Sequence, residues 1–230
     1  MTEEFINQLG RPRNIKDVLA VFSKLTPDAP LTKNIKLFKT VLKQNKPCFW
    51  EMCCALNLYA KLYHPKRYLE IGVRTGRSMA QVASMAPECN IIGIDPFHKD
   101  YGGNPNPGPS FVHSELDRCG FKGNILFHVQ PSSQVFNKKL SVSLGMQGPF
   151  DIITVDGDHT NKGAMADLEA VVPLIADGGM IVFDDITHSR HTLGKVWRQF
   201  RQKHSDHFSY YSNLQDMHGT GLAFKQEFII

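Results

Sequence analysis

The stretch RYLEIGVRTGRSMAQVA, residues 67–83, decides the fold class. Apolar residues lead to Glu70, glycines follow at Gly72 and Gly76, and an amphipathic helix is expected from about Arg77. A strand that passes through a glycine-containing turn into a helix is typical of parallel α/β sheets. The turn lacks the G-x-G-x-x-G spacing of dinucleotide-binding folds, because Arg74 stands two positions after Gly72.

Strand-like and helix-like segments alternate from residue 67 to the end of the chain. The strand candidates are residues 67–72, 90–95, 124–130, 150–156, 179–185, 207–212 and 219–226. The helix candidates between them are residues 76–86, 113–120, 132–140, 161–176 and 191–204. The alternation predicts an α/β fold: a Rossmann-like, doubly wound, mostly parallel seven-stranded sheet whose last two strands form an antiparallel edge hairpin.

Residues 1–64 read as helices only, so the chain divides into an N-terminal helical extension (1–64) and an α/β domain (65–230). One helix is expected over residues 14–25, with Asn14 as its cap, and a second apolar face spans residues 35–42. The broadly apolar stretch 49–63 predicts a buried helix that ends before Pro65. The broad apolar surface of this third helix leaves room for a homodimer.

Composition and charge narrow the class of protein. The chain has 230 residues and a formal charge of +4, without a long basic run. Its densest basic stretch, residues 195–204, has apolar residues at helical spacing, which favours an amphipathic helix over a nucleic-acid partner. No signal peptide and no membrane span is expected. Five cysteines without a C-x-x-C pair argue against a zinc or disulfide framework, so we predict a cytoplasmic protein with reduced thiols.

Three of the predicted strands end on acids: Glu70, Asp95 and Asp156. The carboxyl ends of parallel strands meet at one edge of the sheet, where such folds bind ligands. Glu70 suits a cationic or amino-acid-like ligand better than a pyrophosphate. Asp95 stands where an acid commonly binds ribose hydroxyls, or it is simply a turn residue before Pro96.

A second group of acids follows the strand candidates 150–156 and 179–185. Asp156, Asp184 and Asp185 would lie close together, and unpaired carboxylates so arranged are electrostatically costly. A bound hard cation such as Mg²⁺ would resolve that cost. The alternative is that these acids are solvated or cap the following helices. His159 lies in the same loop and is a candidate general base, while His188 and His191 are less favoured.

Residues 97–111, with three prolines and three glycines, form the longest irregular segment. The segment follows a strand end, so it is either a lid over the site or a plain surface insertion.

Four motifs in order resemble a known family. They are E-I-G-x-x-x-G, I-G-I-D-P, D-I-I-x-V-D-G-D-H and A-D-L-E-A…L-I-A-D-G-G-M-I-V-F-D-D. Together they resemble class I S-adenosylmethionine-dependent methyltransferases, and most closely the metal-dependent O-methyltransferase branch. That branch includes catechol and caffeoyl-CoA O-methyltransferases and sugar methyltransferases of the macrocin and cephalosporin-cluster type. The resemblance covers about residues 66–226. In enzymes of this kind additional helices cover the active site or form a dimer, so the resemblance implies one of these roles for residues 1–64.

The resemblance implies roles for particular residues. The cofactor-binding residues would be Glu70 and Gly72 near its methionine part, Asp95 at the ribose, Ser133 and Gln134 near adenine, and also Gly76 and Asp156. The metal ligands would be Asp156, Asp184 and Asp185, and the catalytic base would be His159 or Asp158. Arg74, in place of the usual middle glycine, and the pair Pro131–Ser132 depart from the pattern.

These expectations describe a Mg²⁺-dependent O-methyltransferase that uses S-adenosylmethionine and acts on a hydroxyl of a small molecule, such as a diol, catechol or sugar. Three alternatives remain open at this stage: a metal-independent or N-directed methyltransferase, a nicotinamide-dependent oxidoreductase, and a non-catalytic binding module.

Overall fold

The computed structural model describes residues 2–44, 49–101, 104–136, 149–188, 192–214 and 218–226. Its centre is a seven-stranded sheet in the order β5-β2-β1-β6-β7-β9-β8. The strands are β1 (Arg67–Ile71), β2 (Asn90–Ile94), β5 (Ile125–His128), β6 (Phe150–Val155), β7 (Ile175–Phe183), β8 (Phe208–Asn213) and β9 (Thr220–Lys225). The first five strands in this order, β5, β2, β1, β6 and β7, pair in parallel. At the other edge β9 pairs antiparallel with β7, and β8 pairs antiparallel with β9. The predicted fold class is confirmed.

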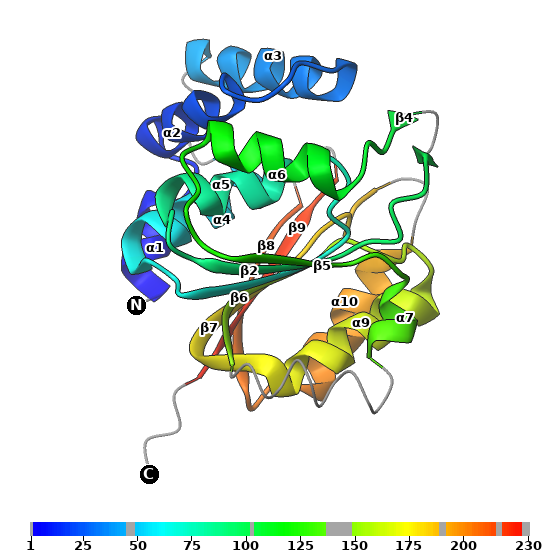
Figure 1. Cartoon of the computed structure of the whole chain (residues 1–230). Helices are drawn as coiled ribbons and strands as arrows, with labels where there is room; N and C mark the ends of the chain where they lie inside the picture. Colours follow the sequence, from blue (N-terminus) through cyan, green and yellow to red (C-terminus); the bar gives the residue numbers. More distant parts are fainter. Residues whose placement is uncertain are drawn as a thin grey trace.

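Helices cover both faces of the sheet (Figure 1). One face carries α4 (Met52–Tyr63), α5 (Arg77–Met85) and α6 (Pro109–Arg118). The other carries α7 (Ser132–Val135), α9 (Asn161–Val171) and α10 (Leu193–Lys203). In α10 the buried residues recur at helical spacing, so the prediction of an amphipathic helix is confirmed.

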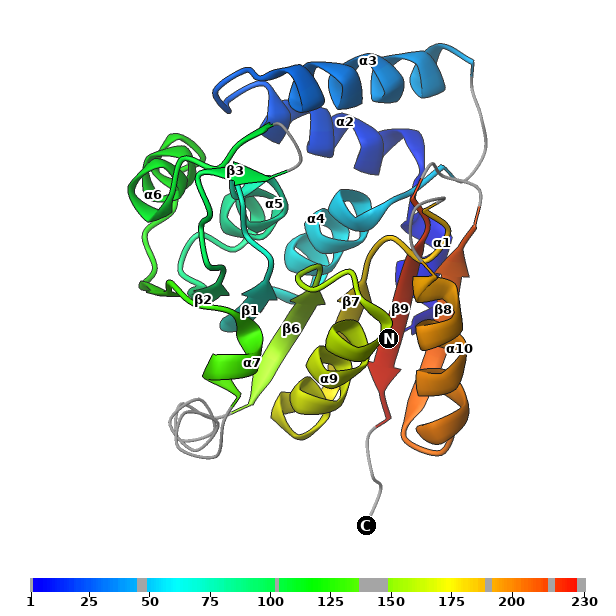
Figure 2. The same ribbon diagram turned by 90° about the vertical axis from the view of Figure 1, so that its right-hand side faces the viewer.

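Three further helices precede α4: α1 (Thr2–Gln8), α2 (Pro12–Phe22) and α3 (Ala29–Lys43). They share a core with the sheet, because the ring of Phe5 lies 6.2 Å from that of Tyr59 in α4 and 5.4 Å from that of Phe224 in β9. The predicted boundary between residues 64 and 65 therefore lies within one continuous hydrophobic core. Figure 2 shows α2 and α3 beyond the edge toward which β1 and β6 point.

Asn14 does not cap a helix, so that prediction is wrong. Helix α2 begins two residues earlier, because Pro12 is already suited to its first turn. Asn14 is instead buried within α2, where its amide donates to the Cys54 carbonyl at 3.2 Å.

Other predicted boundaries shift as well. Part of the irregular segment 97–111 forms a two-stranded ladder of β3 (Asp100–Tyr101) and β4 (Asn104–Pro105), and α6 begins at Pro109 rather than at residue 113. The helix predicted to reach residue 176 ends at Val171, because Pro173 cannot continue it; a 3-10 turn, Val172–Leu174, leads into β7. The helix predicted over 132–140 extends beyond α7 into residues outside the described part.

The four cysteines in the described part, Cys53, Cys54, Cys89 and Cys119, are buried free thiols, as predicted. In the same part of the chain, no helix is both long and apolar enough to cross a membrane.

Candidate active site

The predicted site acids lie at the carboxyl edge of the sheet, after neighbouring strands. Asp156 follows β6, and its N–H donates to the Ile71 carbonyl at the end of β1 at 2.8 Å. Asp184 follows β7, and its N–H donates to the Val155 carbonyl at 3.3 Å. The strand order therefore brings the two groups of acids together, as the sequence predicted.

A carboxylate–histidine cluster stands at this edge. His159 Nε2 lies 3.2 Å from Asp156 Oδ1 and 3.6 Å from Asp185 Oδ2. These three residues form the one group in the described part of the chain whose ligand atoms could hold a metal ion, all within 4.8 Å of one another. We call them the Asp156–His159–Asp185 cluster.

The sequence interpretation missed His218, whose Nδ1 lies 3.1 Å from Asp185 Oδ1 and whose ring stacks on that of His188. Strand β9 pairs antiparallel with β7, so the residue just before β9 returns to the residues just after β7. The T-G-L-A-F run after His218 could have indicated this. His191 lies outside the described residues.

Burial and mutual charge set the protonation of the cluster. Desolvation raises the pKa of Asp156 and of Asp184, and the neighbouring carboxylates raise both further. The hydrogen bond to Asp156 raises the pKa of His159. Burial alone would raise the pKa of Asp185, but the hydrogen bond from His218 and the charges of nearby histidines lower it.

Asp184 and Asp158 do not belong to the group of ligand atoms that forms the cluster. Asp184 accepts a hydrogen bond from the Thr220 hydroxyl at 2.9 Å. The exposed Asp158 accepts the N–H of Thr160 at 2.8 Å, at the start of α9. The metal role of Asp184 and the base role of Asp158 stay predictions.

Glu70 is fully buried below the turn that follows β1. Its carboxyl accepts the hydroxyls of Tyr68, at 2.6 Å, and of Ser78 in α5. Burial raises the pKa of Glu70 to about 8, although these two hydrogen bonds oppose the shift. The carboxyl can therefore change charge near neutral pH when a cationic group approaches.

The two predicted glycines are needed by the backbone. Gly72 has φ +87°, and a Cβ there would lie 1.9 Å from the Asp156 carbonyl oxygen. Gly76 has φ +73°, and a Cβ there would lie 2.6 Å from Val112 of α6. Both positions thus hold the turn close to neighbouring elements.

Asp95 organises the same turn. Its Oδ2 accepts the N–H groups of Val73 at 2.9 Å and Arg74 at 2.8 Å, and its Oδ1 accepts that of Phe97 at 2.5 Å. Arg74 is held at φ +52°. The ribose contact predicted for Asp95 stays a prediction, as do the adenine contacts of Ser133 and Gln134, which lie exposed on α7.

Helix α3 contributes to a small pocket, of about 50 Å³, beside the cluster. Asn34, Leu37 and Phe38 of α3 line it together with Phe49, Glu51, Asp184 and His218. Its lining combines the apolar side chains of Leu37, Phe38 and Phe49 with polar and charged ones.

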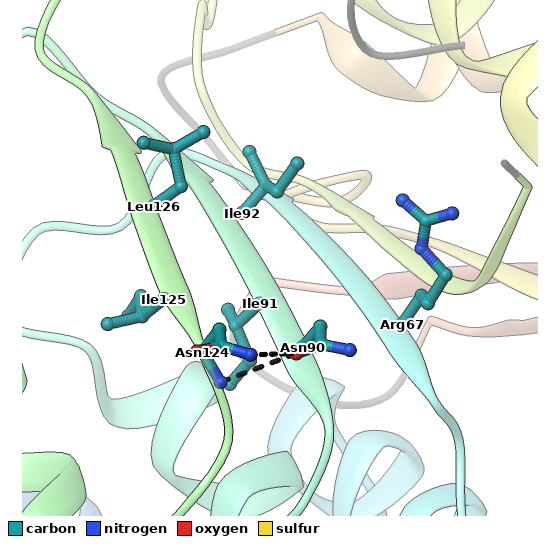
Figure 3. Close-up of a pocket in the computed structure, with 7 residues that line it drawn as sticks. All are labelled: Arg67, Asn90, Ile91, Ile92, Asn124, Ile125 and Leu126. Carbon is teal, nitrogen blue, oxygen red and sulfur yellow. Dashed lines mark hydrogen bonds between the residues drawn. The ribbon is translucent and has the colours of Figure 1, made fainter. Parts of the chain in front are cut away.

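A larger pocket of about 390 Å³ lies elsewhere (Figure 3). It is lined by Arg67, Asn90, Ile91, Ile92, Asn124, Ile125 and Leu126. Arg67 and Asn90 begin β1 and β2, so the pocket extends from the amino ends of the strands. None of the predicted site residues lines it.

A family model described as "Methyltransferase domain" matches residues 69–186, which include the end of β1, all of β6 and β7, and the cluster. The chain belongs to this methyltransferase family. The resemblance to class I methyltransferases is thereby confirmed.

Relatives of this methyltransferase chain agree with the assignment. Caffeoyl-CoA O-methyltransferase 1 of Eucalyptus globulus is 29% identical over 132 residues, which are 56% of this chain and 48% of the relative. The O-methyltransferase TomG of Streptomyces achromogenes, involved in tomaymycin synthesis and solved with S-adenosylmethionine, is similar with a TM-score of 0.59 at 19% identity, over 88% of this chain and 92% of that one. An O-methyltransferase of Bacillus cereus, solved with S-adenosylhomocysteine, is similar with a TM-score of 0.56 at 15% identity, over 88% of this chain and 93% of that one. The solved structures share the fold, and the chain spans about half the length of the curated relatives it matches.

Proposed function

We propose that this chain is an S-adenosylmethionine-dependent O-methyltransferase that uses a divalent cation, with Mg²⁺ or a similar ion as the expectation from sequence, and methylates a hydroxyl of a small molecule. One observation carries the proposal: a carboxylate–histidine cluster lies beside the glycine turn, at the ligand-binding edge of a methyltransferase-family sheet.

The turn after β1 suits the cofactor. When bound, S-adenosylmethionine supplies a methyl group on a positively charged sulfur. Glu70 would face its cationic methionine part, because a nearby cation favours the ionised form of a carboxyl whose pKa burial has raised to about 8. Asp95 and the glycines would keep the turn in the conformation that admits the ligand.

The cluster fits a divalent ion. Ligand atoms that share an ion through bonds of about 2.1 Å lie about 3.0–3.4 Å apart in octahedral or tetrahedral shells. The separations of 3.2 and 3.6 Å in the cluster are close to that range. Asp156 and Asp185 would hold the ion, with Asp184 as the further ligand predicted from sequence. An ion there would supply Lewis-acid activation of the acceptor oxygen.

The chain's own residues would handle the proton and the acceptor. An imidazole, His159 or His218, would accept the hydroxyl proton, since both stand against Asp185 at the carboxyl edge. The pocket between α3 and the pair Asp184–His218 would receive one end of the acceptor, with Leu37 and Phe38 excluding water there. A molecule with adjacent oxygens at that end, such as a catechol or another diol, would suit the polar groups Asp184 and His218.

The pairing inside the cluster also favours a second candidate, a metal-independent methyltransferase. Asp156 and Asp185 each face a histidine, so their charges are compensated without an ion. His159 would then act as the base directly.

Transfer of labelled methyl groups from S-adenosylmethionine to a panel of catechols, diols and sugars, with and without chelator, separates these candidates. We expect Asp156→Ala to lower turnover at least about a hundredfold while cofactor binding persists, because the ion and the imidazole both lose a partner. Asp117→Ala is a matched control, since Asp117 also pairs with a histidine at 3.2 Å, but on the exposed face of α6. Full turnover of the Asp156 variant in chelator would contradict the metal role. An absence of transfer to any hydroxyl acceptor would count against O-methylation.

A further inference from the structure

We infer that the cation site of this chain contains a histidine nitrogen, that of His159, and therefore prefers ions such as Co²⁺ and Zn²⁺ over Mg²⁺. The inference rests on the proposed function, because it concerns the ion that the methyltransferase site would use. It replaces the all-oxygen set of three aspartates with Asp156, Asp185 and His159.

The geometry of His159 supports this assignment. Its Nε2 faces both carboxylates, at 3.2 Å from Asp156 Oδ1 and 3.6 Å from Asp185 Oδ2, so an ion bound between the two oxygens would also meet this nitrogen. The side chain is 19% exposed, so the ring is held within the protein with a small area open to solvent.

The backbone fixes His159 and Asp185 in these positions. The loop that carries His159 begins at Asp156, whose N–H donates to the Ile71 carbonyl, and ends at Thr160, whose hydroxyl caps α9 by accepting the N–H of Gly163 at 3.0 Å. Asp185 has φ +61°, a conformation that aspartate tolerates better than most residues. Contacts to the segment before β9 hold it there, including His218 Nδ1 at 3.1 Å from Asp185 Oδ1. His218 thus orients a ligand from outside.

Asp184 is less well suited to complete the set. Its Oδ1 accepts the Thr220 hydroxyl at 2.9 Å, and its carboxylate lines the pocket below α3 with Glu51 and Phe38. It does not belong to the group of ligand atoms that lie within 4.8 Å of one another in the described residues.

The ligand set decides the class of ion. Mg²⁺ prefers oxygen ligands alone, whereas imidazole nitrogen suits later first-row divalent ions, whose affinities rise toward Cu²⁺. Two carboxylates and one neutral imidazole compensate a doubly charged ion and leave shell positions for the acceptor oxygens.

Metal titration of the chelator-treated full chain tests the inference. Co²⁺ is followed by its visible absorption, and Mg²⁺ by its competition against Co²⁺. We expect Co²⁺ to bind at least about tenfold more tightly than Mg²⁺, and His159→Asn to lower Co²⁺ affinity at least about tenfold with little change for Mg²⁺. Asp184→Asn removes a neighbouring charge but no ligand of the inferred set, so it should lower Co²⁺ affinity less than His159→Asn does.

Two controls keep the test sharp. The chain has ten histidines, so His113→Gln, which removes the exposed His113–Asp117 pair, should leave the Co²⁺ titration unchanged. The second control needs no substitution. X-ray absorption of the parent chain loaded with half an equivalent of Zn²⁺ should show imidazole among the ligands of the zinc.

The outcomes separate this inference from the proposed function when S-adenosylhomocysteine binding is measured on the same samples. Cofactor binding with equal affinity for Mg²⁺ and Co²⁺, or a zinc shell without imidazole, overturns the histidine site alone. A Co²⁺ affinity that His159→Asn does not lower also overturns the histidine site, because later first-row ions can bind oxygen sites tightly as well. A Co²⁺ affinity that His159→Asn lowers, without cofactor binding, supports the histidine site and overturns the methyltransferase proposal.

Discussion

Glu70 shows how burial alone can change the charge of one site residue. Its carboxyl is completely buried, and the Tyr68 and Ser78 hydroxyls only partly replace lost hydration. The pKa of Glu70 is therefore raised from its ordinary value of 4.5 to about 8, and the neutral form is favoured in the folded chain at pH values below it. A cationic ligand would reverse that preference, so we expect cofactor binding near neutral pH to release a proton from Glu70.

The free energy of unfolding should reflect this shift. Between pH 4.5 and about 8 the unfolded chain binds fewer protons at this position than the folded chain, so Glu70 lowers stability as pH rises. Relative to the parent chain, Glu70→Gln should gain stability with rising pH across this window, by up to about 1.4 kcal/mol per pH unit. Urea unfolding at several pH values measures the difference.

Glu169→Gln is a control of opposite sign. Hydrogen bonds from Lys203 and His204 lower the pKa of Glu169 despite the opposing effect of burial, so its contribution is present above the ordinary pKa and is lost as pH falls. Its difference from the parent chain should stay flat between pH 6 and 8. A Glu70→Gln difference that is equally flat would show that Glu70 is ionised throughout.

For individual residues, the sequence predicted which acids would lie close together but not how their side chains are oriented. Asp156 and Asp185 follow from strand ends in a parallel sheet, a rule that depends only on topology. The orientation of Asp185 depends on a left-handed backbone angle, and His218 depends on the pairing of β9 with β7. The backbone angle of Asp185 leaves no mark in the local sequence pattern. The T-G-L-A-F run indicates a strand after His218, but the neighbour of that strand in the sheet has to be known as well.

Among the elements, α3 has the clearest link between sequence and site. Asp28 caps this helix by accepting the Leu31 N–H at 2.7 Å, and it also pairs with Arg77 at the start of α5. One side chain thus ties the helix that lines the small pocket to the turn proposed for the cofactor.

Asp28→Ala should therefore affect both stability and acceptor binding. We expect a loss of about 1–2 kcal/mol from the cap and the ion pair, and a higher KM for the acceptor than in the parent chain, with a smaller change for the cofactor. Asp17→Ala is the comparison, because it removes the ion pair to Lys61 at 2.6 Å without removing a cap. Equal effects of the two substitutions on the acceptor KM would contradict a positioning role for α3.

Most elements could be predicted because their apolar residues recur at strand or helix spacing. The boundaries that failed involve proline or short ladders. Pro12 and Pro109 start helices earlier than the apolar pattern does, and β3 and β4 are two residues long. Such features depend on turn geometry and on contacts distant in sequence.

At the scale of the whole molecule, one core joins the N-terminal helices to the methyltransferase sheet. Phe5 contacts both Tyr59 and Phe224, and α4 packs on α5, so helices α1–α4 are part of the structure that positions the carboxyl edge. Their role as a cap or as a dimer element stays a prediction, as does a cytoplasmic location. A shared core means that a ligand bound at this edge should stabilise the whole chain.

Thermal unfolding of the full chain with different cofactors tests the central claim most directly. The chain is compared alone and with S-adenosylmethionine, S-adenosylhomocysteine or NAD, each in the presence of divalent cation and of chelator. A ligand that binds only the folded state stabilises it by mass action, by about 2.7 kcal/mol at a ligand concentration of a hundred times its Kd. The midpoint of thermal unfolding rises accordingly. We predict a rise with both adenosyl compounds and none with NAD, and a further rise with the cation that chelator removes. No response to either adenosyl compound under any condition would contradict the account.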